Sequence, residues 1–232
     1  MRRFLLPFYL VLSGCVPSAP SDMPSRAQTT SIDGNLPAVK VFTAPRPTPS
    51  YRANSDITRD FLDLAFNLES GRSLPTLTRF EGPISVRVTG RPSAGLGSDL
   101  NRLLHRLRTE AHINIRQNQA DTANITIEAV SRKEIRAMLP QAACFVAPNV
   151  SSLAQYRLAR RTSLVNWTGL KERKRLSIFL PNDASPQEVR DCLHEELAQA
   201  LGPLNDLYRL PDSVFNDDNV HTVLTGFDML IL

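Results

Sequence analysis

The residues best suited to chemistry lie together in one segment, residues 191–206, which reads D-C-L-H-E-E-L-A-Q-A-L-G-P-L-N-D. Read from His194, the segment approaches the metal-binding motif H-E-x-x-H, in which two imidazoles four residues apart share one face of a helix. The second position holds Ala198, so the strict motif is absent. His194 therefore stays a weak candidate for a metal ligand.

A reading that starts one residue later matches the full spacing of a longer metal-binding motif. Read from Glu195, the segment follows the metzincin pattern H-E-x-x-H-x-x-G-x-x-H, with Glu195, Gln199 and Asn205 at the three ligand positions. Glu196 then stands at the general-base position, and Gly202 stands where the helix must end and the chain must turn back. Glu195 and Gln199 are four residues apart and are expected on one helix face.

The side chains at these positions are poor ligands for zinc. Zn²⁺ favours His and Cys, whereas the amide oxygens of Gln199 and Asn205 bind it weakly. Asp206, one residue further, could replace Asn205, and a hard cation that prefers oxygen is an alternative, although three ligands are few for Ca²⁺. Without a metal, the same side chains would cap the helix and bond the following loop. The sequence leaves open no cofactor or one divalent metal ion.

The motif needs a helix to position it, and the sequence marks both ends of that helix. Ser185 is a capping residue, Pro186 suits the first helical position, and Glu188 completes the first turn. The helix is expected to run to about Leu201 and to stop at Gly202 and the Pro that follows.

The elements around this helix predict an α+β fold. Apolar residues at helical spacing predict helices over residues 56–68, 95–111 and 131–138. Alternating or short apolar runs predict strands at residues 84–88, 113–116, 125–130, 163–167 and 176–180. Residues 171–175 are expected to form a solvated, charged hairpin turn between the last two strands. The expected architecture is a mixed sheet of four or five strands with packed helices.

The first fifteen residues, M-R-R-F-L-L-P-F-Y-L-V-L-S-G-C, are similar to the export signal of a bacterial lipoprotein. Two Arg precede an apolar stretch that is too short to span a bilayer, and the tetrapeptide L-S-G-C resembles a lipobox. An ordinary secretory signal with a chance Cys is the alternative. The pattern predicts cleavage before Cys15, lipidation of Cys15 and a membrane-anchored protein on the periplasmic side. Val16 in place of Asp favours the outer membrane over the inner.

The chain divides into three expected segments: a signal peptide at residues 1–14, a lipidated and Pro-rich tether at residues 15–50, and one globular domain at residues 51–232. Residues 16–50 contain seven Pro and little apolar periodicity, which is typical of a flexible linker. The remaining 182 residues can bury a core. The apolar end of the chain has no helix cap, so the domain could be truncated at Leu232.

The net charge limits the classes of partner, and the cysteine content predicts a disulfide. Loss of residues 1–14, which carry two Arg and no acid, lowers the formal net charge from +4 to +2, too balanced for a nucleic-acid partner. With Cys15 lipidated, Cys144 and Cys192 remain, and an even pair in an oxidising compartment predicts a disulfide. Two separate buried thiols are the alternative. The sequence has no phosphate-binding loop, dinucleotide fingerprint or G-x-S-x-G elbow.

Four further segments carry a resemblance to a known family: residues 61–66 (F-L-D-L-A-F) with Glu69, residues 79–83 (R-F-E-G-P), residues 195–202 with Asn205 and Asp206, and residues 211–218 (P-D-S-V-F-N-D-D). Through them, residues 56–232 resemble domain-of-unknown-function family 2927, many of whose members look like lipoproteins. The family supplies no established activity. The strand–helix–strand order before the motif helix also resembles the N-terminal half of metzincin proteases, an analogy of fold from which function does not follow.

Two functions remain open. In the first, a non-catalytic lipoprotein is held to the lipid membrane by Cys15, and its protease-like scaffold binds an envelope protein or peptide or supports envelope assembly. In the second, a metal-dependent peptidase uses Glu196 to activate a water molecule. The missing histidines favour the first. Glu195, Gln199 and Asn205 converging on an open cleft would favour the enzyme, and burial with mutual hydrogen bonds would favour the scaffold.

Overall fold

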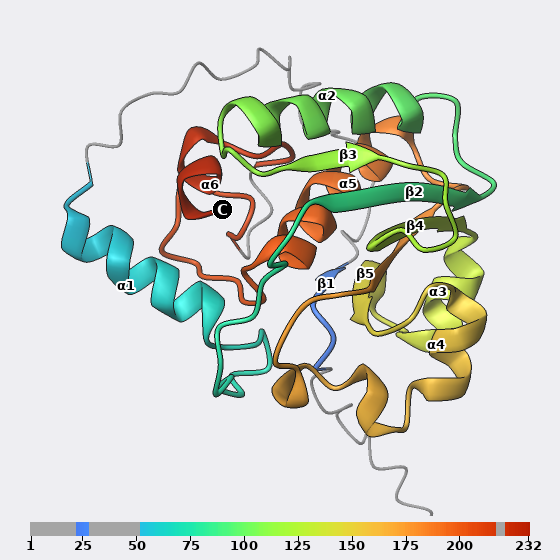
Figure 1. The fold of residues 1–232 in the computed structure, drawn as a ribbon, viewed down its shortest axis with the longest axis horizontal. Coiled ribbons are helices and arrows are strands. Elements are labelled where there is room, and N and C mark those ends of the chain that lie inside the picture. The colour runs from blue at the N-terminus through green and yellow to red at the C-terminus, as the bar shows by residue number, and fades with distance from the viewer. Residues whose placement is uncertain (1–21, 28–51, 217–220) are drawn as a thin grey trace, which may run out of the picture.

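The computed structural model describes residues 22–27, 52–216 and 221–232. The expected signal peptide, the lipidation site Cys15 and most of the expected tether lie outside the described residues. The described chain has the expected α+β class, with helices packed on a mixed sheet (Figure 1). Among the described helices, none combines the length and the apolar character that crossing a bilayer requires.

A six-stranded mixed sheet forms the centre of the molecule. In their order across the sheet, the strands are β1 (Ser25–Ala27), β5 (Ala142–Pro148), β6 (Leu176–Pro181), β4 (Ile125–Val130), β2 (Ile84–Gly90) and β3 (Ile115–Gln117). Strands β2, β3, β4 and β6 are parallel, whereas β5 is antiparallel to β6 and β1 is antiparallel to β5. The sheet therefore has one strand more than the expected four or five.

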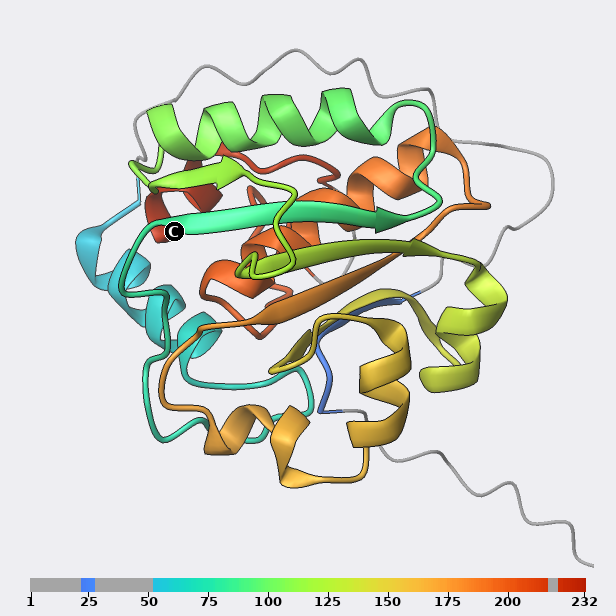
Figure 2. The same ribbon diagram turned by 45° about the vertical axis from the view of Figure 1, so that its right-hand side comes forward.

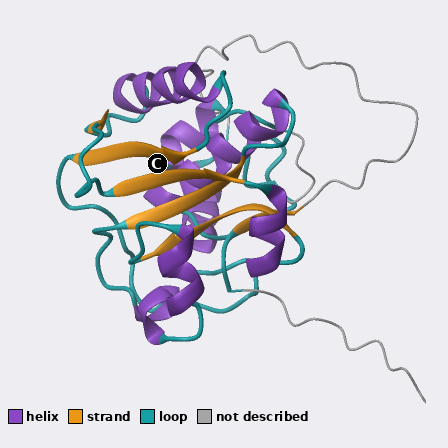
Figure 3. Ribbon diagram, turned by 90° about the vertical axis from the view of Figure 1, so that its right-hand side faces the viewer, coloured by secondary structure: helices purple, strands orange, loops and turns teal. Residues whose placement is uncertain are grey.

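Helices cover both faces of this sheet (Figures 2 and 3). They are α1 (Asn54–Ala65), α2 (Leu96–Thr109), α3 (Arg132–Met138), α4 (Leu153–Ala159), α5 (Pro186–Leu201) and α6 (Gly226–Ile231). Helices α2 and α5 contact each other and pack on one face, and α3 packs with α4 on the other face beside β5 and β6. The motif helix α5 is thus enclosed between the sheet and its neighbours.

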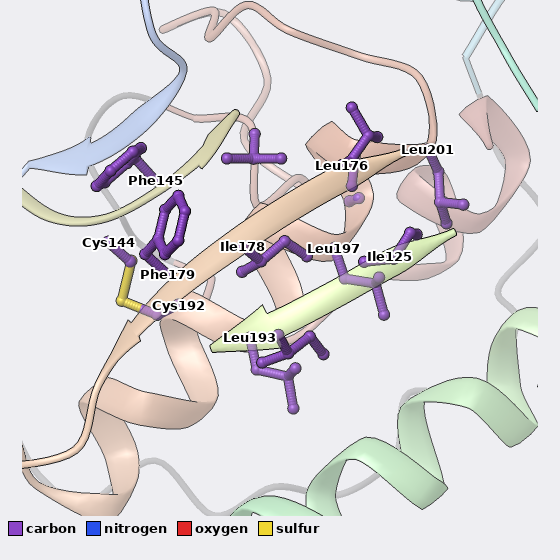
Figure 4. Close-up of a cluster of buried hydrophobic side chains, with 14 of the residues drawn as sticks. Ile125, Cys144, Phe145, Leu176, Ile178, Phe179, Cys192, Leu193, Leu197 and Leu201 are labelled. Atoms are coloured by element: carbon purple, nitrogen blue, oxygen red, sulfur yellow. A yellow bond between two sulfur atoms is a disulfide. The ribbon is translucent and has the colours of Figure 1, made fainter. Parts of the chain in front are cut away.

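Helix α5 packs on the sheet through an apolar stripe. Leu193, Leu197 and Leu201 recur every fourth residue and lie toward Ile178 of β6 and Ile125 of β4 (Figure 4). Side chains at this spacing share one helix face because the α-helix has 3.6 residues per turn. The polar residues of the motif occupy other faces of the same helix.

A disulfide joins β5 to α5, as the cysteine count predicts. The sulfur atoms of Cys144 and Cys192 are 2.02 Å apart, and both residues are fully buried (Figure 4). On the opposite face of β5, the ring of Phe145 lies 4.7 Å from the ring of Phe179 and 5.0 Å from that of Tyr156. Strand β5 therefore contributes to the core on both of its faces.

The prediction of a strand at residues 163–167 is wrong. The chain forms two short 3₁₀ turns there, Ser163–Val165 and Trp167–Gly169. The Thr162 hydroxyl accepts a hydrogen bond from the backbone N–H of Leu164 at 3.3 Å, and the Asn166 side chain accepts one from the N–H of Thr168 at 2.9 Å. Such local bonds from side chain to backbone compete with strand pairing.

The expectation of a solvated hairpin turn at residues 171–175 is also wrong. The antiparallel neighbour of β6 is β5, which lies earlier in the chain, so no hairpin forms there. Lys171, Lys174 and Arg175 are exposed, but Arg173 between them is 2% exposed. One charged residue of this run therefore belongs to the interior.

Strands β1 and β5 have no counterpart among the expected elements. Residues 142–148, A-A-C-F-V-A-P, are buried throughout and show no alternation of apolar and polar residues. Residues 25–27 fall inside the segment expected to be a flexible tether, yet they pair with β5. This part of the tether is a strand of the folded domain.

Candidate functional site

Helix α5 positions the motif, and its ends are those that the sequence predicts. The Ser185 hydroxyl accepts a hydrogen bond from the N–H of Glu188 at 3.2 Å, Pro186 is the first helical residue, and the helix ends at Gly202. Every residue from Asp191 to Leu201 is buried. The motif therefore lies inside the molecule.

Four carboxylates gather beside α5, and we call Glu69, Glu195, Glu196 and Asp206 the acid cluster. Glu195 and Glu196 come from α5, Glu69 from the segment after α1, and Asp206 from the loop after α5. The charges of Glu69, Glu195 and Asp206 all act on Glu196. Gln199, one turn along α5, donates a hydrogen bond from its amide nitrogen to Glu69 Oε1 at 3.1 Å.

Strand β1 lies across the acid cluster and supplies its counter-charge. The Arg26 guanidinium forms an ion pair with Glu195 and lies 3.9 Å from a carboxylate oxygen of Asp191. The backbone N–H of Arg26 donates to Glu196 Oε1 at 3.3 Å, and that of Ser25 donates to Glu69 Oε1 at 3.0 Å. The motif acids therefore hold the N-terminal segment of the same chain.

Among the described residues, two buried hydrogen-bond acceptors in or beside the acid cluster have no partner. Glu196 Oε2 and Gln199 Oε1 are buried, and neither has a hydrogen-bond partner among the described residues. Burial raises the pKa of Glu196 well above its usual range, and the charges of Glu195, Glu69 and Asp206 raise it further. Burial also raises the pKa of Glu69, together with the charge of Asp206. Both pKa shifts favour the protonated carboxyls.

The two candidates for the third ligand position, Asn205 and Asp206, lie beside different parts of the structure. The Asn205 amide donates to the backbone oxygen of Asp63 in α1 at 3.1 Å, so this side chain ties the loop to α1. Asp206, one residue further, is the one whose charge acts on Glu69 and Glu196. The turn at the end of α5 thus brings Asp206 to the cluster.

His194 is a structural residue on another face of α5. Its Nδ1 accepts a hydrogen bond from the backbone N–H of Leu224 at 3.2 Å. Burial lowers the pKa of His194 to about 3, and the nearby charge of Arg106 adds to this effect. The imidazole is therefore neutral, and its bond to Leu224 joins α5 to the C-terminal segment.

The motif side chains are engaged with other parts of the protein. Within the described ranges, no group of three or more His, Cys, Asp or Glu is placed to hold a metal ion. Glu195 is paired with Arg26, and Gln199 points its amide nitrogen at Glu69. A metal ion at these residues would have to displace the guanidinium of Arg26.

Arg173 is a positioning residue that no sequence pattern indicates. Its guanidinium donates to the backbone oxygens of Gln199 and Gly202 at 2.6 Å each, and to the Thr78 hydroxyl at 3.1 Å. It also lies 5.3 Å from the ring centroid of Trp167. A cation at the C-terminus of a helix satisfies its last carbonyls and complements its dipole. Arg173 thereby fixes the end of α5 next to Asp206.

Arg26 and Glu69 are the other residues that the motif does not indicate. Arg26 lies in a Pro-rich and Ser-rich stretch, where the composition predicts no structure. Glu69 lies far from α5 in the sequence, and only its place among the residues shared with family 2927 could have singled it out.

Comparison with known proteins places most of the chain in one family. The family model described as "Protein of unknown function (DUF2927)" matches residues 54–232. No curated protein and no solved structure matches the chain.

Proposed function

The chain belongs to the DUF2927 family, and from that premise we propose that it is a lipid-anchored envelope protein whose protease-like domain binds a partner without catalysis. Cys15 would carry the lipid and hold the protein on the periplasmic side of a membrane. Val16 favours the outer membrane over the inner. The observation that carries this proposal is the use of the motif acids: Glu195 and Glu196 hold Arg26 of the same chain.

The state of Glu196 argues against catalysis. A general base must be unprotonated and must reach the water or substrate that it serves. Glu196 is 0% exposed, and burial raises the pKa of its carboxyl, which favours the protonated form over the carboxylate that a base requires. The strand that carries Arg26 covers it. A scaffold that binds through backbone and charge needs neither an open cleft nor a free base.

The alternative is a metal-dependent peptidase with Glu196 as general base and with Glu195, Gln199 and Asn205 or Asp206 as ligands. One observation favours it. Gln199 Oε1, at a candidate ligand position, is a buried acceptor without a hydrogen-bond partner among the described residues, and a cation would satisfy it. This function requires Arg26 to leave the acid cluster.

Metal content separates the two functions. The mature chain, purified from periplasm without chelator, is compared with the double variant Glu195→Ala, Gln199→Ala by mass spectrometry, and both are incubated with a peptide library. We expect no stoichiometric metal and no hydrolysis. One equivalent of metal that the double variant loses, with hydrolysis that Glu196→Gln abolishes, would establish the peptidase. Glu81→Gln, whose side chain is 59% exposed, is the control.

A further inference from the structure

Strand β1 covers only part of the edge that β5 presents. It pairs with Ala142, Cys144 and Phe145, and the register shifts between Arg26 and Ala27. One more hydrogen bond joins the N–H of Val146 to the backbone oxygen of Pro24 at 3.4 Å. A three-residue strand is short against the usual five or six. The pairing of the edge strand β1 with β5 is therefore short.

The residues before β1 are held at two further points. Asp22 accepts a hydrogen bond from the Ser70 hydroxyl at 2.8 Å and lies 2.5 Å from a guanidinium nitrogen of Arg72. Met23 is 9% exposed and lines a cavity of ≈ 480 Å³. Tyr156 and Trp167 also line this cavity, together with the charged side chains of Arg160 and Arg161.

Most of these contacts do not depend on which peptide makes them. The N–H groups of residues 25 and 26 donate to Glu69 and Glu196, and any extended backbone offers the same donors. Specificity comes from two charges at a fixed spacing, Asp22 on Arg72 and Arg26 on Glu195. The segment 22–27 thus has the form of a ligand that is recognised as an extended strand.

The acid cluster is also not saturated by this segment. Glu196 Oε2 and Gln199 Oε1 stay without partners among the described residues, although both are buried beside the bound strand. Gln199 Oε1 would accept an N–H donor, and leaving such an acceptor unpaired is costly. A strand that donates more hydrogen bonds than residues 22–27 would therefore bind better.

We propose that the edge of β5, together with the acid cluster and Arg72, is a binding site for an extended segment of a partner protein. That segment carries an acidic residue and, four residues later, a basic one. It adds to β5 as an antiparallel strand and places its basic side chain between Glu195 and Asp191. Residues 22–27 occupy the site as a built-in competitor. This inference rests on the proposed function, whose unnamed partner it describes by its chemistry.

The test is a titration with a labelled peptide that has the sequence of residues 22–27, D-M-P-S-R-A, with blocked ends. The protein is the full mature chain in the form Cys15→Ser, with and without Asp22→Ala, Arg26→Ala. We expect the peptide to bind the double variant at least tenfold more tightly than the parent, because the internal segment then competes less well. The peptide D-M-P-S-A-A should bind at least tenfold more weakly than D-M-P-S-R-A.

Further variants sharpen the result. Glu195→Gln in the same background should remove the preference for the Arg peptide, whereas Glu81→Gln should leave it unchanged. Circular dichroism checks that each variant is folded. If the double variant does not fold, Asp22→Ala alone replaces it, since this change leaves the pair of Arg26 with Glu195 intact.

The outcomes separate this inference from the function on which it rests. A folded variant that does not bind the peptide, or binds the Arg and Ala peptides equally, overturns the peptide site and leaves a non-catalytic scaffold. Binding followed by cleavage of the peptide, detected by mass spectrometry, keeps the site and overturns the absence of catalysis. Binding without cleavage supports both.

Discussion

Among the single residues, Glu196 is the one whose burial makes the stability of the domain depend on pH. Its carboxyl is fully buried, one of its oxygens has no partner among the described residues, and three other acids act on it. The unfolded chain loses this proton near pH 4.5, whereas the folded chain retains it to higher pH. Stability therefore falls as the pH rises above about 4.5, because the folded state binds more protons than the unfolded state.

Replacing Glu196 by Gln should stabilise the domain at alkaline pH. The amide has nearly the same shape and no charge to bury, and its oxygen can still accept the N–H of Arg26. At pH 8 we expect a gain of about 1–3 kcal/mol in the free energy of unfolding, shrinking toward pH 5. Urea unfolding at several pH values measures it. A loss of stability that is equal at pH 5 and pH 8 would contradict this account, and Glu81→Gln is the control.

Arg173 should matter far more than the charged residues beside it. Arg173→Met keeps the apolar length of the side chain but leaves the backbone oxygens of Gln199 and Gly202 without their donor. We expect a loss of about 2–4 kcal/mol in the free energy of unfolding. Arg175→Met, at an exposed position two residues away, should change it by less than about 0.5 kcal/mol. Equal effects in chemical denaturation would show that Arg173 does not fix the end of α5.

At the scale of elements, the site depends on how α5 and β5 are held together. The apolar stripe of α5 packs on the sheet, and the disulfide of Cys144 with Cys192 joins the helix to the strand on which β1 lies. Arg26 is the register partner of Cys144. Three elements from distant parts of the chain therefore meet at one point, and the covalent link lies directly beneath the bound segment.

Removing the disulfide should destabilise the whole domain. The cysteines are 48 residues apart in sequence, and in the chain-entropy model a loop of this length contributes at most about 4 kcal/mol. We expect Cys144→Ala, Cys192→Ala to lose up to this amount in denaturant unfolding. Reducing agent should lower the stability of the parent chain by a similar amount and leave that of the double variant unchanged. Cys15→Ser, which leaves Cys144 and Cys192 unchanged, should retain the full stability.

For the whole molecule, the proposed function assigns partner binding to the domain and membrane attachment to Cys15. The described helices include none that could cross a membrane. The proposed attachment is the lipid on Cys15. A lipid anchor with two or more chains holds a protein stably at a membrane.

Cys15→Ser should therefore release the protein from the membrane fraction without changing the domain. We expect loss of labelling by radioactive palmitate, transfer to the soluble fraction, and a melting temperature equal to that of the detergent-extracted parent. A Cys15→Ser chain that stays with the membrane would show that another part of the chain attaches it.

Features that depend on local patterns can be predicted from the sequence alone. The α+β class, the bounds of α5 and strands β2, β4 and β6 follow from hydrophobic periodicity and from the caps at Ser185 and Gly202, which act within a few residues. The pairing of Cys144 with Cys192 followed from counting cysteines. The approach of Asp206 to the end of α5 also lay within reach, because a helix end and a short turn constrain it.

The contacts that fill the site join distant parts of the chain, so they follow from the three-dimensional fold. Strand β5 is buried on both faces, so it lacks the alternation that marks a half-exposed strand. The three residues of β1 are ordered by β5 and by the acid cluster, not by their own composition. The pairs of Arg26 with Glu195 and of Arg173 with the end of α5 join distant parts of the chain. Burial holds these charged side chains in fixed contacts. Which residues are buried depends on the whole fold.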